Sequence, residues 1–151
     1  MTGVQTCALP ISELSGLENL INDPTENYSI GNFKDLICWQ KCRELRIQLE
    51  KMTLSFPKDE KTRLADQIIR ASRSTTNNIA EGFGRFHYKD SIRFYYISRG
   101  SLSELLDHLT IAYDNGIIEK STLLELENLS HEAARILNGY INFINSKITK
   151  P

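Results

Sequence analysis

The sequence is short of cysteine and has no long apolar run, and each shortage excludes a class of protein. Three cysteines in 151 residues are too few for a scaffold held by disulfides. No apolar run approaches the ~20 residues of a membrane-spanning helix, so we expect no membrane partner. The N-terminus has no basic start and too short an apolar stretch for a secretory signal. We therefore expect a cytoplasmic protein.

Motifs of catalysis and metal binding are also scarce. His131 and Glu132 begin a zinc-protease pattern, but Arg135 stands where the second histidine must lie. Cys38 and Cys42 are four residues apart and could share a metal, but they fall on an apolar helix face, where cysteine packs as a small apolar residue. We predict no catalytic residue, no metal site and no cofactor, and hence a protein that is not an enzyme.

Composition divides the chain into three parts. Residues 1–12, MTGVQTCALPIS, match the translation of a sequencing-library adapter read from a GTG start codon, and we interpret them as an artefact in a metagenomic sequence. Residues 13–30 carry four acids, no base and several turn-forming residues. They are either a native tail or translated upstream DNA. Residues 31–151 carry the pattern of one folded domain.

In residues 31–151, apolar side chains recur every three or four positions, which indicates helices. The pattern predicts helices over 33–55 and 59–82, a third that ends at Asn115-Gly116, and a fourth from Glu119 or Ser121. Gly116 suits a left-handed cap. No segment alternates with a period of two, so we expect no strands. The sequence predicts an all-α, antiparallel up-down four-helix bundle.

The third helix has apolar residues outside its main stripe. Phe94, Ile97 and Leu105 lie off the seam, and a second apolar face on a helix usually buries a second surface. We therefore expect self-association. Gly100 lies in the middle of this helix, where glycine costs ~1 kcal/mol. We interpret it as a place where a neighbouring helix approaches the backbone closely.

The stretch TTNNIAEGFGRF, residues 75–86, contains two glycines but does not fit a phosphate-binding loop. A P-loop needs a preceding strand, four residues between its glycines, and a Lys-Ser or Lys-Thr pair after them. We predict instead that Gly82 and Gly84 end the second helix and turn the chain. Asn78 and Glu81 lie on the polar face of this helix, where we expect structural or inter-subunit hydrogen bonds.

Basic residues are concentrated in the middle of the chain. Residues 61–100 carry eight bases and three acids, a net charge of +5, whereas residues 101–151 carry four bases and seven acids, a net charge of −3. A localised basic patch of this kind is typical of nucleic-acid binding, although a solvated surface has the same composition. The candidate nucleic-acid-binding residues are Arg63, Arg70, Arg73, Arg85, Lys89, Arg93 and Arg99. Nearby Phe83, Phe86 and Tyr88 would either stack on unpaired bases or belong to the core.

Several segments together resemble a known family. They include FKDL from Phe33, WQK from Trp39, NIAEG from Asn78 with Gly84-Arg85, and GSLSEL from Gly100. Over about residues 32–148 the chain resembles a bacterial four-helix-bundle family whose founding members are encoded in intervening sequences of large-subunit ribosomal RNA genes.

The resemblance implies an up-down bundle, often a homopentamer, with no established enzymatic activity. Distant relatives are the accessory proteins of diversity-generating retroelements, which bind a reverse transcriptase and nucleic acid. Two hypotheses remain open. The first is a self-associating bundle that binds RNA or DNA. The second is a protein-interaction scaffold, for example an accessory subunit of a reverse transcriptase.

Overall fold

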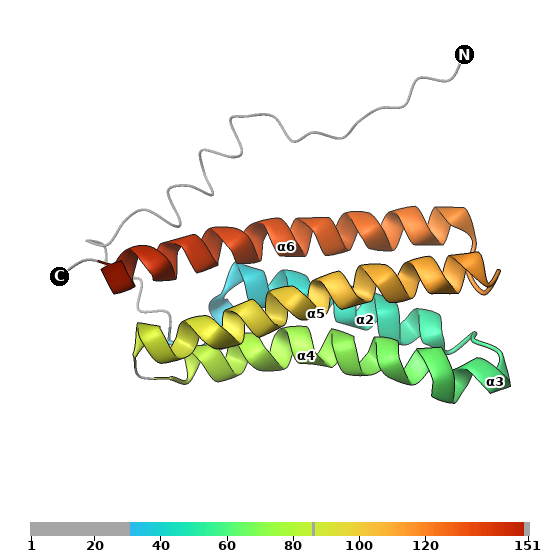
Figure 1. The fold of residues 1–151 in the computed structure, drawn as a ribbon, viewed down its shortest axis with the longest axis horizontal. Helices are drawn as coiled ribbons and strands as arrows, with labels where there is room; N and C mark the ends of the chain where they lie inside the picture. The colour runs from blue at the N-terminus through green and yellow to red at the C-terminus, as the bar shows by residue number, and fades with distance from the viewer. Residues whose placement is uncertain (1–30, 86, 150–151) are drawn as a thin grey trace, which may run out of the picture.

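The computed structural model describes residues 31–85 and 87–149 and shows four long helices in an antiparallel bundle (Figure 1). No strand occurs in these two ranges, and the predicted up-down bundle is confirmed. The interpretations of residues 1–12 and 13–30 lie outside the described residues. The elements are η1 (Phe33–Asp35), α2 (Ile37–Thr53), α3 (Lys58–Glu60), η2 (Lys61–Ala65), α4 (Asp66–Phe83), α5 (Tyr88–Asp114) and α6 (Lys120–Thr149).

Most helix ends follow the sequence signals, but the first predicted helix, 33–55, is divided into η1 and α2 by the extended backbone of Leu36, and α2 ends at Thr53. Pro57 separates α2 from α3 and is the N-cap of α3. Residues 58–83 run without interruption through α3, η2 and α4, and η2 is a π-helical widening that the periodicity did not predict. After α5, Gly116 adopts φ 68°, the left-handed conformation expected at this position.

The four helices form a closed ring of neighbours. The helix α4 packs against α2 and α5, and α6 packs against the same two helices, so that consecutive helices are adjacent and the ring closes between α2 and α6. In Figure 1, α4, α5 and α6 run side by side with α2 behind them. Polar contacts also join neighbours, since Lys41 pairs with Glu132 across α2 and α6 at 3.0 Å.

The core is aliphatic along most of its length and matches the predicted stripes. Leu105, which the sequence placed on a second apolar face, is fully buried in this core. That prediction is wrong because the buried arc of α5 faces both α4 and α6 and is therefore wider than one seam. Other fully buried aliphatic residues include Leu45, Leu49, Ile68, Ile79, Leu102, Leu109, Leu137 and Ile144.

The contact between α4 and α5 is made largely by small polar residues. The Ser98 hydroxyl donates to the Thr75 carbonyl oxygen at 2.8 Å, and Ser101 donates to the Ser74 hydroxyl oxygen at 2.8 Å. Thr75 in turn donates to the Ser72 carbonyl oxygen within α4. Buried hydroxyls of this size let two helices approach closely while each keeps a hydrogen-bond partner.

One section of the core contains titratable groups kept neutral by burial. Burial raises the pKa of the Cys38 and Cys42 thiols to about 12. The rings of Tyr95 and Tyr140 meet edge to face with centroids 5.1 Å apart, and burial raises the pKa of both phenols. At neutral pH these four side chains therefore behave as packing groups.

Candidate nucleic-acid interface

The turn between α4 and α5 brings two arginines, one just after α4 and one on α5, onto one aromatic ring. The guanidinium groups of Arg85 and Arg93 each lie 4.7 Å from the centroid of the Phe94 ring. Arg85 follows the end of α4, where the Gly84 amide donates to the Ala80 carbonyl oxygen, while Arg93 and Phe94 lie on the second turn of α5. The ring holds two cations near each other at an exposed site, an interaction of about 0.5–1 kcal/mol for each.

Lys89 extends this cationic group toward the start of α5. It is exposed, lies one helical turn before Arg93, and has no partner within residues 31–85 and 87–149. Arg93 also has no acidic partner in that part of the chain, whereas Arg85 pairs with Glu81 in the last turn of α4. Two of the three cations at the turn are thus available to an external anion.

Further along α4, Arg70 and Arg73 share the outward face of the helix. Arg70 is exposed and has no ion pair among the described residues. Arg73 donates to a carboxylate oxygen of Glu50 on α2 at 2.8 Å, so its charge is partly compensated. These two arginines lie on α4, a few turns before Arg85, which follows the end of that helix.

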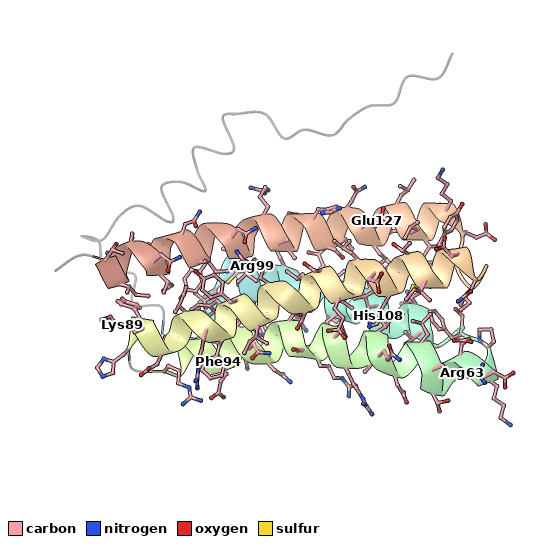
Figure 2. All side chains as sticks on the ribbon, viewed as in Figure 1. Arg63, Lys89, Phe94, Arg99, His108 and Glu127 are labelled. Atoms are coloured by element: carbon pink, nitrogen blue, oxygen red, sulfur yellow. The ribbon has the colours of Figure 1, made fainter. Side chains whose placement is uncertain are left out.

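The structure does not bring the other two candidates into this group. Figure 2 shows Arg63 and Lys89 at opposite ends of the bundle. Arg63 has Glu60 for a neighbour at 3.9 Å. Arg99 faces α6, where its guanidinium lies 4.9 Å from the Tyr96 ring centroid and 3.5 Å from the Asn138 side-chain oxygen. The seven candidates therefore form one cluster at the turn, a pair on α4 and two separate positions.

The glycines of the TTNNIAEGFGRF stretch match their predicted roles only in part. Gly82 lies inside α4 and is buried, and a Cβ there would lie 2.6 Å from Cε1 of Tyr95. The prediction that Gly82 turns the chain is therefore wrong, because the residue makes room for the Tyr95 ring. Gly84 caps α4 with φ −71°, so it does end the helix, but in a conformation open to other residues.

Gly100 also differs from its interpretation. A Cβ at Gly100 would meet nothing within 4 Å, so no helix of the same chain approaches the backbone there. The prediction of a close approach by a neighbouring helix is wrong within one chain, since Gly100 lies on the outward side of α5.

Asn78 and Glu81 make local contacts. The Asn78 amide donates to the Ser74 carbonyl oxygen at 2.8 Å and to its hydroxyl oxygen at 3.0 Å. Ser74 also receives the hydrogen bond of Ser101, so Asn78 supports the polar contact between α4 and α5. Glu81 pairs with Arg85 along α4. A contact of either residue with another subunit stays a prediction.

A shallow hollow lies on the outward face of α4, next to the arginine cluster. Its volume is about 530 Å³, and it is lined by Asn77, Ala80, Glu81, Gly84 and Arg85. The sequence candidates did not include this hollow, although the sequence carries a signal for it. Asn77, Glu81 and Arg85 recur every four residues on one helix face, with two small residues between them.

The described residues offer little for metal chemistry. Within residues 31–85 and 87–149, no group of three or more His, Cys, Asp or Glu side chains is placed to hold a metal ion. Cys38 and Cys42 are buried in the core. The His108 ring is also buried, with Nε2 at 3.4 Å from a Glu104 oxygen and with no hydrogen-bond partner for Nδ1 in the described part of the chain.

The two ends of the bundle differ in charge. Residues 85–99, around the α4–α5 turn, carry four bases and one acid. Residues 104–127, which surround the α5–α6 turn, carry six acids and one base. The two turns lie at opposite ends of the bundle (Figure 1). Positive charge is therefore concentrated at one end, and negative charge at the other end of the same helix pair.

Comparison with known proteins identifies the family. The model of the 23S rRNA-intervening sequence proteins matches residues 34–139, which is most of the bundle. The chain belongs to this family. The family resemblance seen in the sequence is thereby confirmed, while the relation to retroelement accessory proteins stays a prediction.

A solved structure shows the same fold. The crystal structure of a protein with unknown function from the S23 ribosomal protein family of Bacteroides thetaiotaomicron VPI-5482 matches with a TM-score of 0.67 at 21% identity. The match covers 72% of this chain and 98% of the other. At this identity the likeness establishes the bundle and leaves the activity open.

No curated protein matches the chain. Within the part of the chain that the structure describes, no helix is long and apolar enough to cross a membrane.

Proposed function

We propose that this chain is a non-enzymatic bundle that self-associates and binds RNA or DNA through the basic surface at the α4–α5 turn. The observation that carries the proposal is the convergence of Arg85 and Arg93, from two sides of the turn, on the Phe94 ring. Lys89 adds a third cation one helical turn from Arg93. Clustered, exposed cations fit a phosphate backbone, which carries closely spaced negative charges.

Binding to a phosphate backbone should be strongly salt-dependent. Each phosphate that the protein neutralises releases counterions, so affinity falls with salt by a slope of about 0.9 per contact on duplex and about 0.7 on single strands. Lys89→Glu with Arg93→Glu should remove about two contacts. We expect the slope to fall by about 1.4–1.8 and the low-salt affinity to fall about ten-fold or more. Fluorescence titration of structured RNA and duplex DNA at two salt concentrations measures both.

A matched control separates a local effect from a change in net charge. Lys58 and Lys120 are exposed and lie on the helices that begin at the opposite end of the bundle. Lys58→Glu with Lys120→Glu alters the charge by the same amount and should leave binding within about two-fold, because interactions beyond a Debye length are screened. Absence of binding by the unmodified protein at low salt, or equal losses in the two variants, would contradict the proposal.

The alternative is a protein-interaction scaffold, for example an accessory subunit of a reverse transcriptase. The pairing of Arg73 with Glu50 and of Arg85 with Glu81 favours it, because these cations are already partly compensated by acids of the chain itself. Pull-down after nuclease treatment distinguishes the two functions. A protein partner retained without nucleic acid supports the scaffold, whereas loss of all partners supports binding through nucleic acid.

Self-association is proposed to use the outward face of α5. Ile97 is 48% exposed on this face, and the adjacent Tyr96 and Ile111, about four helical turns further along α5, are also exposed. Gly100 leaves open space beside Ile97, so another helix could approach the backbone closely there. An oligomer, such as the pentamer that the family resemblance implies, would cover these apolar groups.

Placing a charged side chain on this apolar face should dissociate the oligomer. Ile97→Glu would bury a charge without a partner in the contact, so we expect light scattering to report a smaller mass than for the unmodified protein. Leu124, on α6, is equally exposed at 48%, and Leu124→Glu should keep the original mass. A monomeric unmodified protein, or dissociation by Leu124→Glu alone, would exclude the α5 face.

A further inference from the structure

The hollow on α4 is shallow and open to solvent, and its volume is large enough for one flat ligand ring. Asn77 and Glu81 lie above one another on α4, because residues i and i+4 of a helix share one face, and Arg85, just past the end of α4, pairs with Glu81. Ala80 and Gly84 have almost no side chain, so the helix backbone forms a low floor between the polar groups. The hollow of about 530 Å³ lies within the range of small-ligand sites.

The polar groups around this floor have unused hydrogen-bonding capacity. The Asn77 side chain is exposed and has no partner in residues 31–85 and 87–149. The Glu81 and Arg85 side chains are 51% and 42% exposed, and each bonds the other. A carboxylate accepts about four hydrogen bonds and a guanidinium donates five, so both groups keep unused positions.

The Glu81–Arg85 pair presents N–H donors directly beside two acceptor oxygens. The Watson–Crick edge of guanine has the complementary order, with the O6 acceptor followed by the N1–H and N2–H donors. Adenine and cytosine each offer one exocyclic amine beside an acceptor nitrogen, which would face a carboxylate oxygen unfavourably. Guanine is therefore the one common base of RNA or DNA that occupies both carboxylate oxygens and the guanidinium together.

The pair is also held in place before a ligand arrives. Arg85 bonds Glu81 on one side and lies over the Phe94 ring on the other. Two contacts on one guanidinium restrict its rotamers, which lowers the entropy cost of binding. Arg93 lies at the same ring, where it could meet the phosphate of a strand whose base enters the hollow.

From this geometry we infer that the hollow of Asn77, Ala80, Glu81, Gly84 and Arg85 binds an unpaired guanine base of a bound nucleic-acid strand. Glu81 accepts from N1–H and N2–H, Arg85 donates to O6, and the bare backbone at Gly84 lies against the ring. The inference rests on the proposed nucleic-acid binding and adds base selectivity to it. The edge that is read is common to RNA and DNA, so the selectivity applies to both.

Single-base substitution in a uniform strand tests the inference. Uridine RNA strands of about twelve nucleotides, each with one central guanosine, adenosine, cytidine or inosine, are titrated at low salt. We expect the guanosine strand to bind about ten-fold more tightly than the adenosine strand. Inosine lacks the N2 amine and should fall between them. A thymidine DNA strand with one deoxyguanosine should show the same preference over deoxyadenosine.

Variants locate the selectivity in the hollow. Glu81→Gln removes one acceptor and should reduce the guanosine preference to about two-fold while adenosine-strand binding persists. Glu44→Gln is the matched control, because Glu44 is 50% exposed and also pairs with a base of its own helix, Lys41. Ala80→Leu fills the hollow at an outward-facing position and should likewise remove the preference.

The outcomes separate this inference from the proposed function. Failure of every strand to bind overturns the proposed function. Equal binding of all the RNA strands by the unmodified protein leaves nucleic-acid binding intact and overturns the guanine site. If the Glu81→Gln and Ala80→Leu variants keep the preference for the guanosine strand, the proposed guanine site is also overturned. If free GMP competes at the same concentration as the guanosine strand, the hollow does not require a base within a strand. That result overturns the assignment of the ligand to a nucleic-acid strand.

Discussion

Replacing Gly82 with alanine should lower the free energy of unfolding by about 1–3 kcal/mol, although alanine is the better helix former. The added Cβ would lie 2.6 Å from Cε1 and 2.9 Å from Cζ of Tyr95, and 3.1 Å from the Ser91 carbonyl oxygen. Tyr95 is 1% exposed and its ring packs against Tyr140, so it has little room to move. Urea unfolding followed by circular dichroism measures the loss.

Gly84→Ala is the matched control, two residues away. A Cβ there would meet only carbonyl oxygens, at 3.5 and 3.6 Å, in ordinary van der Waals contact. We expect no loss of stability from this change, since the φ of −71° suits alanine. In a double-mutant cycle, Tyr95→Leu should reduce the cost of Gly82→Ala because it removes the clashing ring atoms. Equal stability of the two alanine variants would contradict the close packing at Gly82.

The bundle should lose stability as the pH rises above 9. In the folded state, burial raises the pKa of the Cys38 and Cys42 thiols from 9.0 to about 12. Below pH 9 both thiols are neutral in both states, so the full stability is present. Between pH 9 and 12 the unfolded chain releases protons that the folded chain keeps, which favours unfolding. Each thiol then lowers the free energy of unfolding by up to about 1.4 kcal/mol per pH unit.

Urea unfolding at pH 7, 9, 10 and 10.5 checks this window. The double variant Cys38→Ala with Cys42→Ala should be less stable at pH 7, because it leaves space in the core, but should lose less stability between pH 9 and 10. The pKa of Tyr95 and Tyr140 is raised in the same sense from 10.0, so their effect adds at the upper end. An identical pH dependence in the double variant would show that the thiols do not cause the loss.

Most of the fold could be predicted because it depends on local periodicity. The spacing of apolar residues located all four long helices, and Pro57 and Gly116 located two of their ends. The π-helical turn at Lys61–Ala65 was not predicted, since one extra residue per turn hardly alters the pattern over so short a segment.

The candidate site could be predicted only in part, because sequence spacing does not fix contacts between helices. The basic block included Arg85 and Arg93, but their meeting at Phe94 depends on the path of the turn. Gly82 was read as a turn residue because its reason, the Tyr95 ring, lies on another helix. Arg99 was placed with the basic stripe, although it faces Asn138 of α6.

The opposite charges at the two ends give the bundle an electric dipole along its long axis. Four bases and one acid surround the α4–α5 turn, while six acids and one base surround the α5–α6 turn. In the field of a polyanion such a molecule rotates before contact, so that the end with Lys89 and Arg93 leads and the acidic end trails. Encounters in which the acidic end makes the first contact are then rare. Dissolved salt would weaken this alignment first and the contacts themselves later, because alignment acts over longer distances.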